Sequence, residues 1–238
     1  MCSIFGVLEI RQDLEAVRKM ALEQSRLLRH RGPDWSGIYT SKNAVLAHER
    51  LAIVDVNAGA QPILSTDGRQ VLAVNGEIYN HLAIRERYAR RYAFRTDSDC
   101  EVILPLYLEQ GPEFLEELNG MYAFCLYDEE QDRWMMARDP MGIIPLYYGY
   151  DTHGQLFVAS EMKALVGVCN EVHEFPPGHY WCSGMKAPER WYRRAWEDFD
   201  SVGDAETDRQ ALADALEASV VRHLMTDVPY GVLLSGGL

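Results

Sequence analysis

Cys2 stands at a position where its own backbone could activate it as a nucleophile. Methionine aminopeptidase generally removes Met1 when the next residue is small, and this would leave Cys2 with a free α-amino group. The reference pKa of such an amine is about 8, so its neutral form can accept the thiol proton near physiological pH. One residue would then supply both the nucleophile and the base. Taken alone, however, a cysteine at position 2 is better explained by chance.

The pattern around Cys2 predicts that it begins a strand, because residues 1–10 alternate between apolar and polar positions. An amphipathic helix is predicted over 13–30, and the glycines and proline of 29–37 predict an irregular loop after it. The next β-rich runs are 44–56 and 70–79. Within the second run, Asn75-Gly76 is a tight-turn signal that we expect to break the strand.

Helix and hairpin signals alternate through the middle of the chain. Ser98 and Glu101 have the spacing of a capping box and predict a helix over 98–108. Polar turns then separate two pairs of strands, 121–128 with 133–139 and 144–150 with 155–160, and a short strand is expected within 174–182. Strands joined by hairpins are antiparallel, so the sequence predicts an α+β protein with sheets covered by helices.

The last forty residues have a different character. The acidic stretch 196–206 lacks periodicity and is interpreted as a linker. A helix is predicted over 208–225, with Leu212, Leu216, Val220 and Leu224 on one face. Residues 230–238 predict a buried strand that runs into the glycine loop Ser235-Gly236-Gly237, which is how a phosphate-binding unit opens. We therefore expect the truncated start of a second domain here.

Composition excludes several classes of function. The formal net charge of −13 disfavours nucleic acid as a partner. No apolar run is long enough to cross a bilayer. The N-terminus does not fit a signal peptide, because charged residues interrupt the apolar core that one would need. The five cysteines and seven histidines show no disulfide framework and no metal-binding spacing, and His48 is interpreted as a structural histidine. These features favour a cytoplasmic protein that binds no metal in this part of the chain.

Many short motifs occur in the order seen in one enzyme family. They are MCSIFGV, RHRGPDWSG, HERLAIVD, QPI, LAVNGEIYNH, SDCEVIL, NGMYAF, RDPMGIIPLYYG and VPYGVLLSGGL. In this order and over the whole chain, the sequence resembles the class II glutamine amidotransferases, and among them the asparagine synthetases that use glutamine. Ser3 is consistent with that family, whose members commonly begin Cys-Ser or Cys-Gly.

The resemblance implies a fold and a domain organisation. Residues 2–195 are expected to form a four-layer αββα sandwich of the N-terminal-nucleophile hydrolase type. Residues 196–206 would be the linker, and 207–238 the truncated start of an α/β ATP-pyrophosphatase domain. Leu233, Ser235, Gly236 and Gly237 would contact ATP in the intact enzyme.

The resemblance also assigns roles to residues of the first domain. Cys2 would attack the side-chain amide of glutamine, and Asn75 with Gly76 would form the oxyanion hole. Arg50 would bind the α-carboxylate of glutamine, or alternatively pair with a nearby acid such as Asp55. Asp99 would hold the α-ammonium, and Glu77 would share it or alternatively be an ordinary strand residue. The residues expected to line the pocket beside Arg50 are Leu51, Ala52, Ile53 and Val54.

The function implied is glutaminase activity in this chain, with ammonia passed to an ATP- and Mg²⁺-dependent amidation of aspartate elsewhere in a longer enzyme. Glutaminase chemistry itself would need no cofactor, and a homodimer is a possible assembly. A first rival is an amidotransferase that supplies ammonia to another acceptor, such as a sugar phosphate or a peptide; β-lactam-forming synthetases are disfavoured because they typically lack a working nucleophile. A second rival is a degenerate domain that only senses glutamine or mediates assembly, which would require loss of Cys2, Arg50, Asn75, Gly76 or Asp99.

Overall fold

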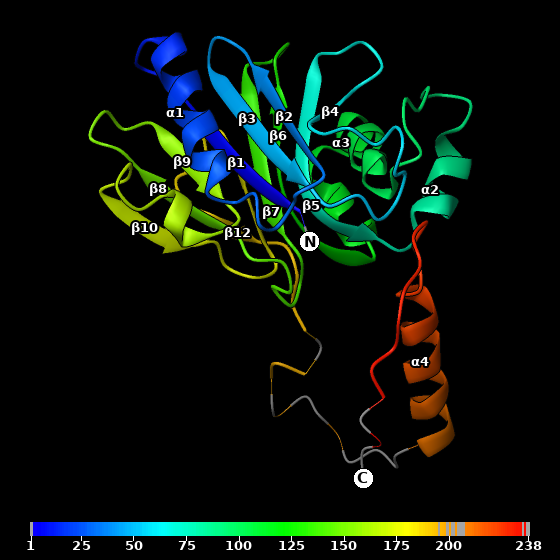
Figure 1. Cartoon of the computed structure of the whole chain (residues 1–238). Coiled ribbons are helices and arrows are strands. Elements are labelled where there is room, and N and C mark those ends of the chain that lie inside the picture. Colours follow the sequence, from blue (N-terminus) through cyan, green and yellow to red (C-terminus); the bar gives the residue numbers. More distant parts are fainter. Residues whose placement is uncertain are drawn as a thin grey trace.

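Two six-stranded antiparallel sheets pack face to face in the part of the chain that the structure describes (Figure 1). The structure is a computed structural model, and it describes residues 2–194, 196–198, 200, 203, 208–234 and 236. The first sheet has the order β10-β8-β9-β1-β3-β2 and the second β12-β11-β7-β6-β5-β4. The first sheet is built from β1 (Ser3–Leu8), β2 (Trp35–Thr40), β3 (Ala44–Arg50), β8 (Tyr147–Tyr150), β9 (Leu156–Ala159) and β10 (Glu171–Glu174). The second is built from β4 (Ile63–Leu64), β5 (Gln70–Ile78), β6 (Gly120–Asp128), β7 (Arg133–Arg138), β11 (His179–Cys182) and β12 (Glu189–Arg190).

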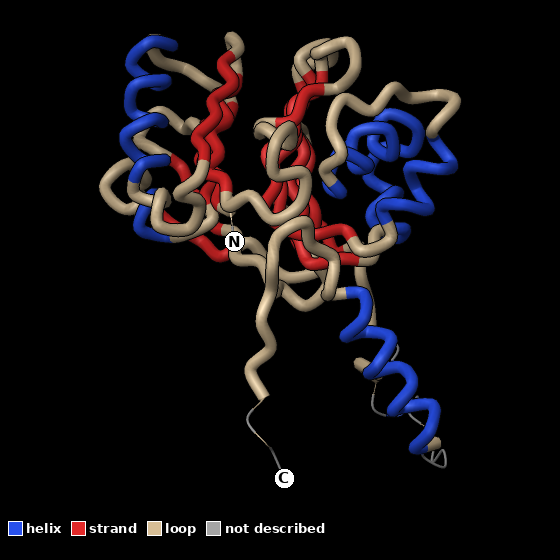
Figure 2. The backbone as a smooth tube through the Cα atoms, turned by 45° about the vertical axis from the view of Figure 1, so that its right-hand side comes forward, coloured by secondary structure: helices blue, strands red, loops and turns tan. Residues whose placement is uncertain are grey.

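Helices cover the outer face of each sheet, which completes the predicted four layers (Figure 2). Helix α1 (Leu14–Arg26) packs on the first sheet through Val17 and Ala21. The second sheet is covered by α2 (His81–Tyr88), η1 (Asp99–Val102), α3 (Ile103–Gln110) and η2 (Gly111–Glu117). A further short helix, η3 (Met162–Ala164), follows β9. The αββα fold class predicted from the sequence is confirmed.

The alternation of side chains along its strands lets the second sheet contribute one face to each of two hydrophobic cores. In β5, Leu72 and Val74 face the helices, whereas Val71 and Ala73 face the first sheet. This alternation follows from the two-residue period of a strand. Small residues such as Ala73 on the inner face let the two sheets approach each other around Ile4 and the rest of the central core.

Two local predictions between residues 29 and 56 were partly wrong. Residues Trp35–Gly37, expected in a loop, begin β2, where Gly37 pairs with His48. A Cβ on Gly37 would lie 1.8 Å from the carbonyl oxygen of Gln61, so glycine is needed for close packing and not for a turn. The run 44–56 keeps strand structure only as far as Arg50.

The strongest turn signal of the sequence is also overruled. β5 continues through Asn75-Gly76, which pair with Ala123 and Tyr122 of β6. A Cβ on Gly76 would lie 2.2 Å from the carbonyl oxygen of Met121. Glycine is therefore required by the approach of the neighbouring strand, and the pair of residues stays in the middle of a ladder.

The helix predicted over 98–108 is present but starts differently. It begins as the 3₁₀ helix η1 and continues as α3 to Gln110. Ser98 is the N-cap residue, yet its side chain makes no capping hydrogen bond. Glu101 instead accepts hydrogen bonds from the backbone N–H groups of Arg95 and Thr96, each at 2.8 Å. The capping box is thus replaced by a carboxylate that holds the preceding loop.

The C-terminal region stands apart from the sheets (Figure 1). Helix α4 (Arg209–Arg222) forms as predicted, and the carboxylate of Asp208 caps it through Gln210 and Ala211. Its apolar side chains are exposed, with Leu212 and Leu216 at 65 % and 67 % of their full exposure. Residues 230–234 form no strand and are exposed, since no strand lies beside them among the described residues, so the prediction of a buried strand there was wrong.

Two further features of the chain concern the linker and the membrane. Of the interpreted linker 196–206, the described residues 196–198, 200 and 203 lie in no strand and no α-helix. The boundaries 2–195, 196–206 and 207–238 stay a prediction. Within the described residues, no helix combines the length and the apolar character that crossing a membrane would require.

Candidate active site

One cleft collects nearly all the predicted site residues of the first domain. It lies where β1, β3 and β5 approach the loop after β3 and the start of η1. It is lined by Cys2, Arg50, Leu51, Ile53, Val54, Gly59, Gln61, Asn75, Gly76, Glu77, Ser98, Asp99, Cys100, Met121 and Ile144. Residues that are far apart in the sequence therefore meet at one point of the fold.

The thiol of Cys2 is held by the backbone of Leu51. Its sulfur accepts a hydrogen bond from the Leu51 N–H at 3.3 Å and donates to the Leu51 carbonyl oxygen at 3.4 Å. Burial raises the pKa of the Cys2 thiol, and the Leu51 hydrogen bond and the charge of Arg50 only partly oppose this. The thiol is therefore protonated at rest, and it needs a base at the moment of attack.

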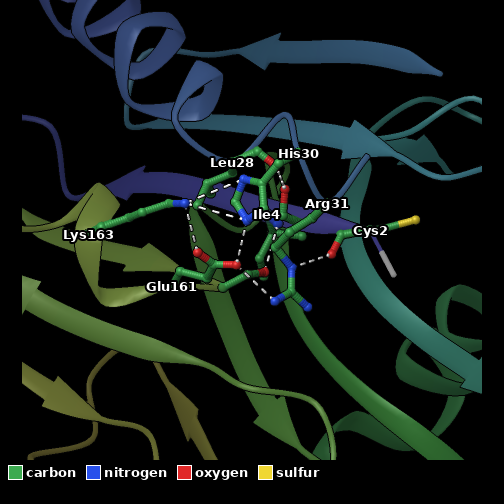
Figure 3. A network of polar contacts seen from close by, with 9 residues as sticks. Cys2, Ile4, Leu28, His30, Arg31, Glu161 and Lys163 are labelled. Carbon is green, nitrogen blue, oxygen red and sulfur yellow. Dashed lines mark hydrogen bonds and ion pairs between the residues drawn. The ribbon is translucent and has the colours of Figure 1, made fainter. Parts of the chain in front are cut away.

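The backbone of Cys2 is anchored on the opposite side by a charged cluster (Figure 3). The Arg31 Nε donates to the Cys2 carbonyl oxygen at 3.1 Å, and Arg31 Nη1 pairs with Glu161 at 3.0 Å. Lys163 pairs with the same carboxylate at 3.1 Å. Figure 3 shows the Cys2 sulfur directed away from this cluster, so the cluster fixes the main chain and leaves the thiol free to face the cleft.

Asn75 presents a buried hydrogen-bond donor to the cleft. The residue is 1 % exposed, and its buried Nδ2 has no hydrogen-bond partner among the residues that the structure describes. An unpaired buried donor costs free energy, on the order of 1–3 kcal/mol, and such groups concentrate at functional sites. Since Asn75 lines the cleft with Cys2, this nitrogen is available to an acceptor that enters it.

Two side chains hold the strand just before Asn75. Gln61 accepts from the Val74 N–H at 2.8 Å and donates to the Val74 carbonyl oxygen at 2.9 Å. The His48 Nε2 lies 2.9 Å from the same carbonyl oxygen. Burial lowers the pKa of His48 to about 4, so His48 is neutral near pH 7 and donates from Nε2. Its contacts are those of a structural histidine.

Arg50 is buried beside the cleft, and one of its guanidinium nitrogens donates hydrogen bonds to backbone carbonyl oxygens. Arg50 Nη2 donates to the carbonyl oxygens of Val54 at 3.1 Å and Asp55 at 2.5 Å. Among the described residues Arg50 makes no ion pair with the Asp55 carboxylate, which accepts from the backbone of Ala58 and Asp97 instead. The alternative of an Arg50–Asp55 ion pair is thus not what the structure shows, and the guanidinium keeps its charge for an anion.

Two acids face the other side of the cleft. Burial raises the pKa of Asp99, whose Oδ2 accepts from the Ile78 N–H at 2.7 Å. Burial and the nearby charge of Asp99 raise the pKa of Glu77. Because burial disfavours the charge of both carboxylates and the charge of Asp99 further disfavours that of Glu77, a cation bound between them would be favoured.

The loop after β3 supplies most of the residues predicted for it. Leu51, Ile53 and Val54 line the cleft, but Ala52 does not. The Ala52 N–H donates to the Asp34 carboxylate at 2.9 Å. The sequence interpretation missed the cleft residues Gly59, Gln61, Ser98, Cys100, Met121 and Ile144. Gln61 lies in the QPI motif, and the other missed residues except Gly59 also lie within motifs of the family resemblance, which could have pointed to them.

Of the four residues predicted to contact ATP, the structure describes two, and these two do not form a site. Leu233 is fully exposed, and a Cβ added to Gly236 would meet nothing within 4 Å. Ser235 and Gly237 lie outside the described residues. The described part of this segment therefore offers no cradle that fits a nucleotide.

Comparison with known proteins agrees with this geometry. A family model described as a glutamine amidotransferase domain matches residues 1–180, and one described as asparagine synthase matches 211–238. Over the whole chain, the sequence is 64 % identical to asparagine synthetase B [glutamine-hydrolyzing] of Escherichia coli K12, and 50 % identical to a probable asparagine synthetase [glutamine-hydrolyzing] of Schizosaccharomyces pombe. In both cases the chain spans 43 % of the relative's length.

Solved structures support the fold. The glutamine phosphoribosylpyrophosphate amidotransferase of B. subtilis, complexed with ADP and GMP, superposes with a TM-score of 0.67 at 23 % identity. This likeness covers 81 % of the present chain and 50 % of that chain, and at such low identity it bears on the fold alone. The match of the family model over residues 1–180, on a fold that places Cys2 and Asn75 in one cleft, shows that the chain belongs to the family of glutamine amidotransferase domains.

Proposed function

We propose that the chain hydrolyses glutamine to glutamate and ammonia through a thioester on Cys2. The observation that carries this proposal is the placement of the Cys2 thiol in the same cleft as the unpaired Nδ2 of Asn75. A nucleophile and an unused buried donor are the two groups that acyl transfer needs at its reacting carbon.

The first half of the reaction forms the thioester. The Cys2 sulfur attacks the carboxamide carbon of glutamine while the thiol proton passes to the α-amine of Cys2, which is free once Met1 has been removed. The carboxamide oxygen becomes an oxyanion that accepts from Asn75 Nδ2 and the Gly76 N–H. When the tetrahedral intermediate collapses, the α-ammonium returns its proton to the departing nitrogen, and ammonia leaves.

The second half releases glutamate. Water attacks the thioester carbon, and the α-amine of Cys2 takes a proton from it. The same oxyanion donors stabilise the second intermediate. Collapse breaks the carbon–sulfur bond, glutamate leaves, and the proton on the α-ammonium returns to the Cys2 sulfur.

Charged groups on two sides of the cleft orient the substrate in this proposal. The guanidinium of Arg50 binds the α-carboxylate of glutamine, and Asp99 together with Glu77 binds the α-ammonium. Burial and the charge of Asp99 raise the pKa of Glu77, and a bound ammonium would offset both effects. The amide of glutamine is then held between two charged anchors and directed toward Cys2.

A degenerate, non-catalytic domain is less well supported. It would require the loss of at least one group among Cys2, Arg50, Asn75, Gly76 and Asp99, and all five are present and line the cleft. An acceptor such as a sugar phosphate is disfavoured by the match of residues 211–238 to the asparagine synthase model.

The use of the ammonia is a wider proposal. We propose that it serves the ATP- and Mg²⁺-dependent amidation of aspartate in a protein that carries a complete synthetase domain. The support is the naming of the relatives, of which this chain spans 43 %. A homodimer and a cytoplasmic location stay predictions.

The test of the glutaminase proposal is mass spectrometry after exposure to diazo-oxo-norleucine, a reactive glutamine analogue. We expect one adduct on Cys2, Met1 absent, and protection by glutamine. Cys100 is an internal control, because it lines the same cleft but burial raises its pKa well above the ordinary value. An adduct on Cys100 alone, or none on a chain that begins with Cys2, would contradict the proposal.

A further inference from the structure

Asp227 joins the C-terminal segment to the loop that lines the cleft. Its N–H donates to the Ile53 carbonyl oxygen at 2.9 Å, and its Oδ2 accepts from the Asp55 N–H at 2.7 Å. Both partners belong to the loop after β3, and Ile53 lines the cleft. A single residue therefore brackets this loop with two hydrogen bonds, although 172 residues separate Asp227 from Asp55.

Asp55 contacts both of the segments that carry the charged groups of the site. Its carbonyl oxygen accepts from Arg50, and its Oδ2 accepts from the Asp97 N–H at 2.9 Å, two residues before Asp99. Its φ of 53° places it in the left-handed region, which is unfavourable for a residue with a Cβ and must be held by its surroundings. Fixing Asp55 thus fixes both the guanidinium of Arg50 and the segment that carries Asp99.

The end of α4 is docked close by. His223 and Tyr79 have ring centroids 4.5 Å apart, and Tyr79 follows β5 two residues after Glu77. None of the residues of α4 itself is buried. The contacts described for this region therefore gather at its C-terminal end, beside the cleft.

We infer that Asp227 is a positioning residue for the glutamine site, acting through Asp55 on Arg50 and on the segment of Asp99. This inference rests on the proposed glutaminase function. Asp227 lies within residues 211–238, which match the asparagine synthase model. A movement of that segment would consequently change how well the cleft holds the two charged ends of glutamine.

Three variants of the whole chain test the inference. Asp227→Ala removes the acceptor for the Asp55 N–H, and we expect the KM for glutamine to rise about tenfold, the change that one hydrogen bond of ordinary strength produces. The kcat should change much less, because Cys2 and Asn75 are not held by Asp227. Asp227→Asn keeps an oxygen acceptor and should recover most of the affinity. Asp214→Ala is the matched control. Among the described residues the Asp214 side chain accepts only from Gln210 within α4, so this variant should leave KM unchanged.

Hydrogen exchange provides a readout independent of turnover. In Asp227→Ala, we expect faster exchange at the Asp55 and Asp97 amides and no change in the β5–β6 ladder. If the unmodified chain hydrolyses glutamine while Asp227→Ala leaves KM within twofold and both amides as protected as before, the inference is overturned. If the unmodified chain hydrolyses no glutamine, the proposed function fails, and the two amides still decide whether Asp227 holds the loop.

Discussion

The Cys2 sulfur lies between the N–H and the carbonyl oxygen of Leu51, at 3.3 Å and 3.4 Å. The carbonyl oxygen accepts from a thiol but repels a thiolate, whereas the N–H favours the thiolate. Because burial already raises the pKa of Cys2, the resting group is the thiol. The attack must then be assisted by a base within reach, and the α-amine of Cys2 is that base in the proposed mechanism.

The first prediction concerns this amine. A protease site placed before Cys2 gives a chain whose Cys2 nitrogen is a peptide amide, which cannot accept a proton. We expect kcat to be lower by about 10²–10⁴-fold, the usual contribution of a general base, and to recover when the protease leaves Cys2 as the first residue. Steady-state ammonia release before and after cleavage measures this. Equal activity in both forms would rule out the amine as the base.

The second prediction concerns the unpaired nitrogen of Asn75. Asn75→Ala removes a donor that no described group of the resting protein uses, so the fold should keep its stability. We expect kcat to fall about 10²–10³-fold, equivalent to ~2.7–4 kcal/mol of barrier, with a small change in KM. Glutaminase kinetics and a thermal melt together check this. A kcat within threefold of the original would show that the oxyanion is stabilised elsewhere.

The third prediction concerns the fork of Arg50. Arg50→Lys retains the charge but loses the planar geometry that matches a carboxylate, and we expect the KM for glutamine to rise about tenfold or more. The control substrate is 4-aminobutanamide, which lacks the α-carboxylate. Its poor turnover should be the same in both chains. An equal loss of activity toward glutamine and toward 4-aminobutanamide would indicate a general disturbance of the cleft.

The fourth prediction concerns Asp99 and pH. Burial raises the pKa of Asp99, so ionising it in the unliganded fold costs free energy, and this cost appears as the pH rises through and above that pKa. Asp99→Asn carries no charge and can still accept from the Ile78 N–H. We expect a higher Tm than the original chain at pH 8 without glutamine, with the difference shrinking toward pH 4. Calorimetric binding of glutamine at pH 8 should be lost in the same variant. A lower Tm at pH 8 would show that the carboxylate stabilises the empty fold.

Hairpins and strand periodicity are local signals, and they predict antiparallel sheets covered by helices. The four-layer sandwich itself was predicted from the family resemblance. The turn at Asn75-Gly76 was predicted wrongly for a physical reason: a two-residue signal is overruled where β5 is paired with β6 and a carbonyl of Met121 approaches the glycine. The strand expected over 230–234 fails for the opposite reason, since no strand lies beside it among the described residues. Strands depend on partners that a local pattern cannot supply.

The candidate site likewise has a part that the sequence predicts and a part that it does not. Cys2, Asn75 and Asp99 lie in short motifs whose family resemblance assigns them to one pocket, and the cleft contains all three. The bonds from Gln61 to Val74 and from Asp227 to Asp55 join segments with no shared periodicity. Such contacts are visible only once the chain is folded.

The position of β1 has a consequence for how the protein is made. β1 lies between β3 and β9, and Phe5 pairs with Ala159. The ribosome therefore delivers the first strand long before its second neighbour exists, and the amino end stays open on the nascent chain during that interval. The excision of Met1, on which the proposed chemistry depends, has its widest opportunity then. Faster translation, which shortens this interval, or a shortage of the aminopeptidase would yield chains that fold but keep Met1 and are therefore inactive.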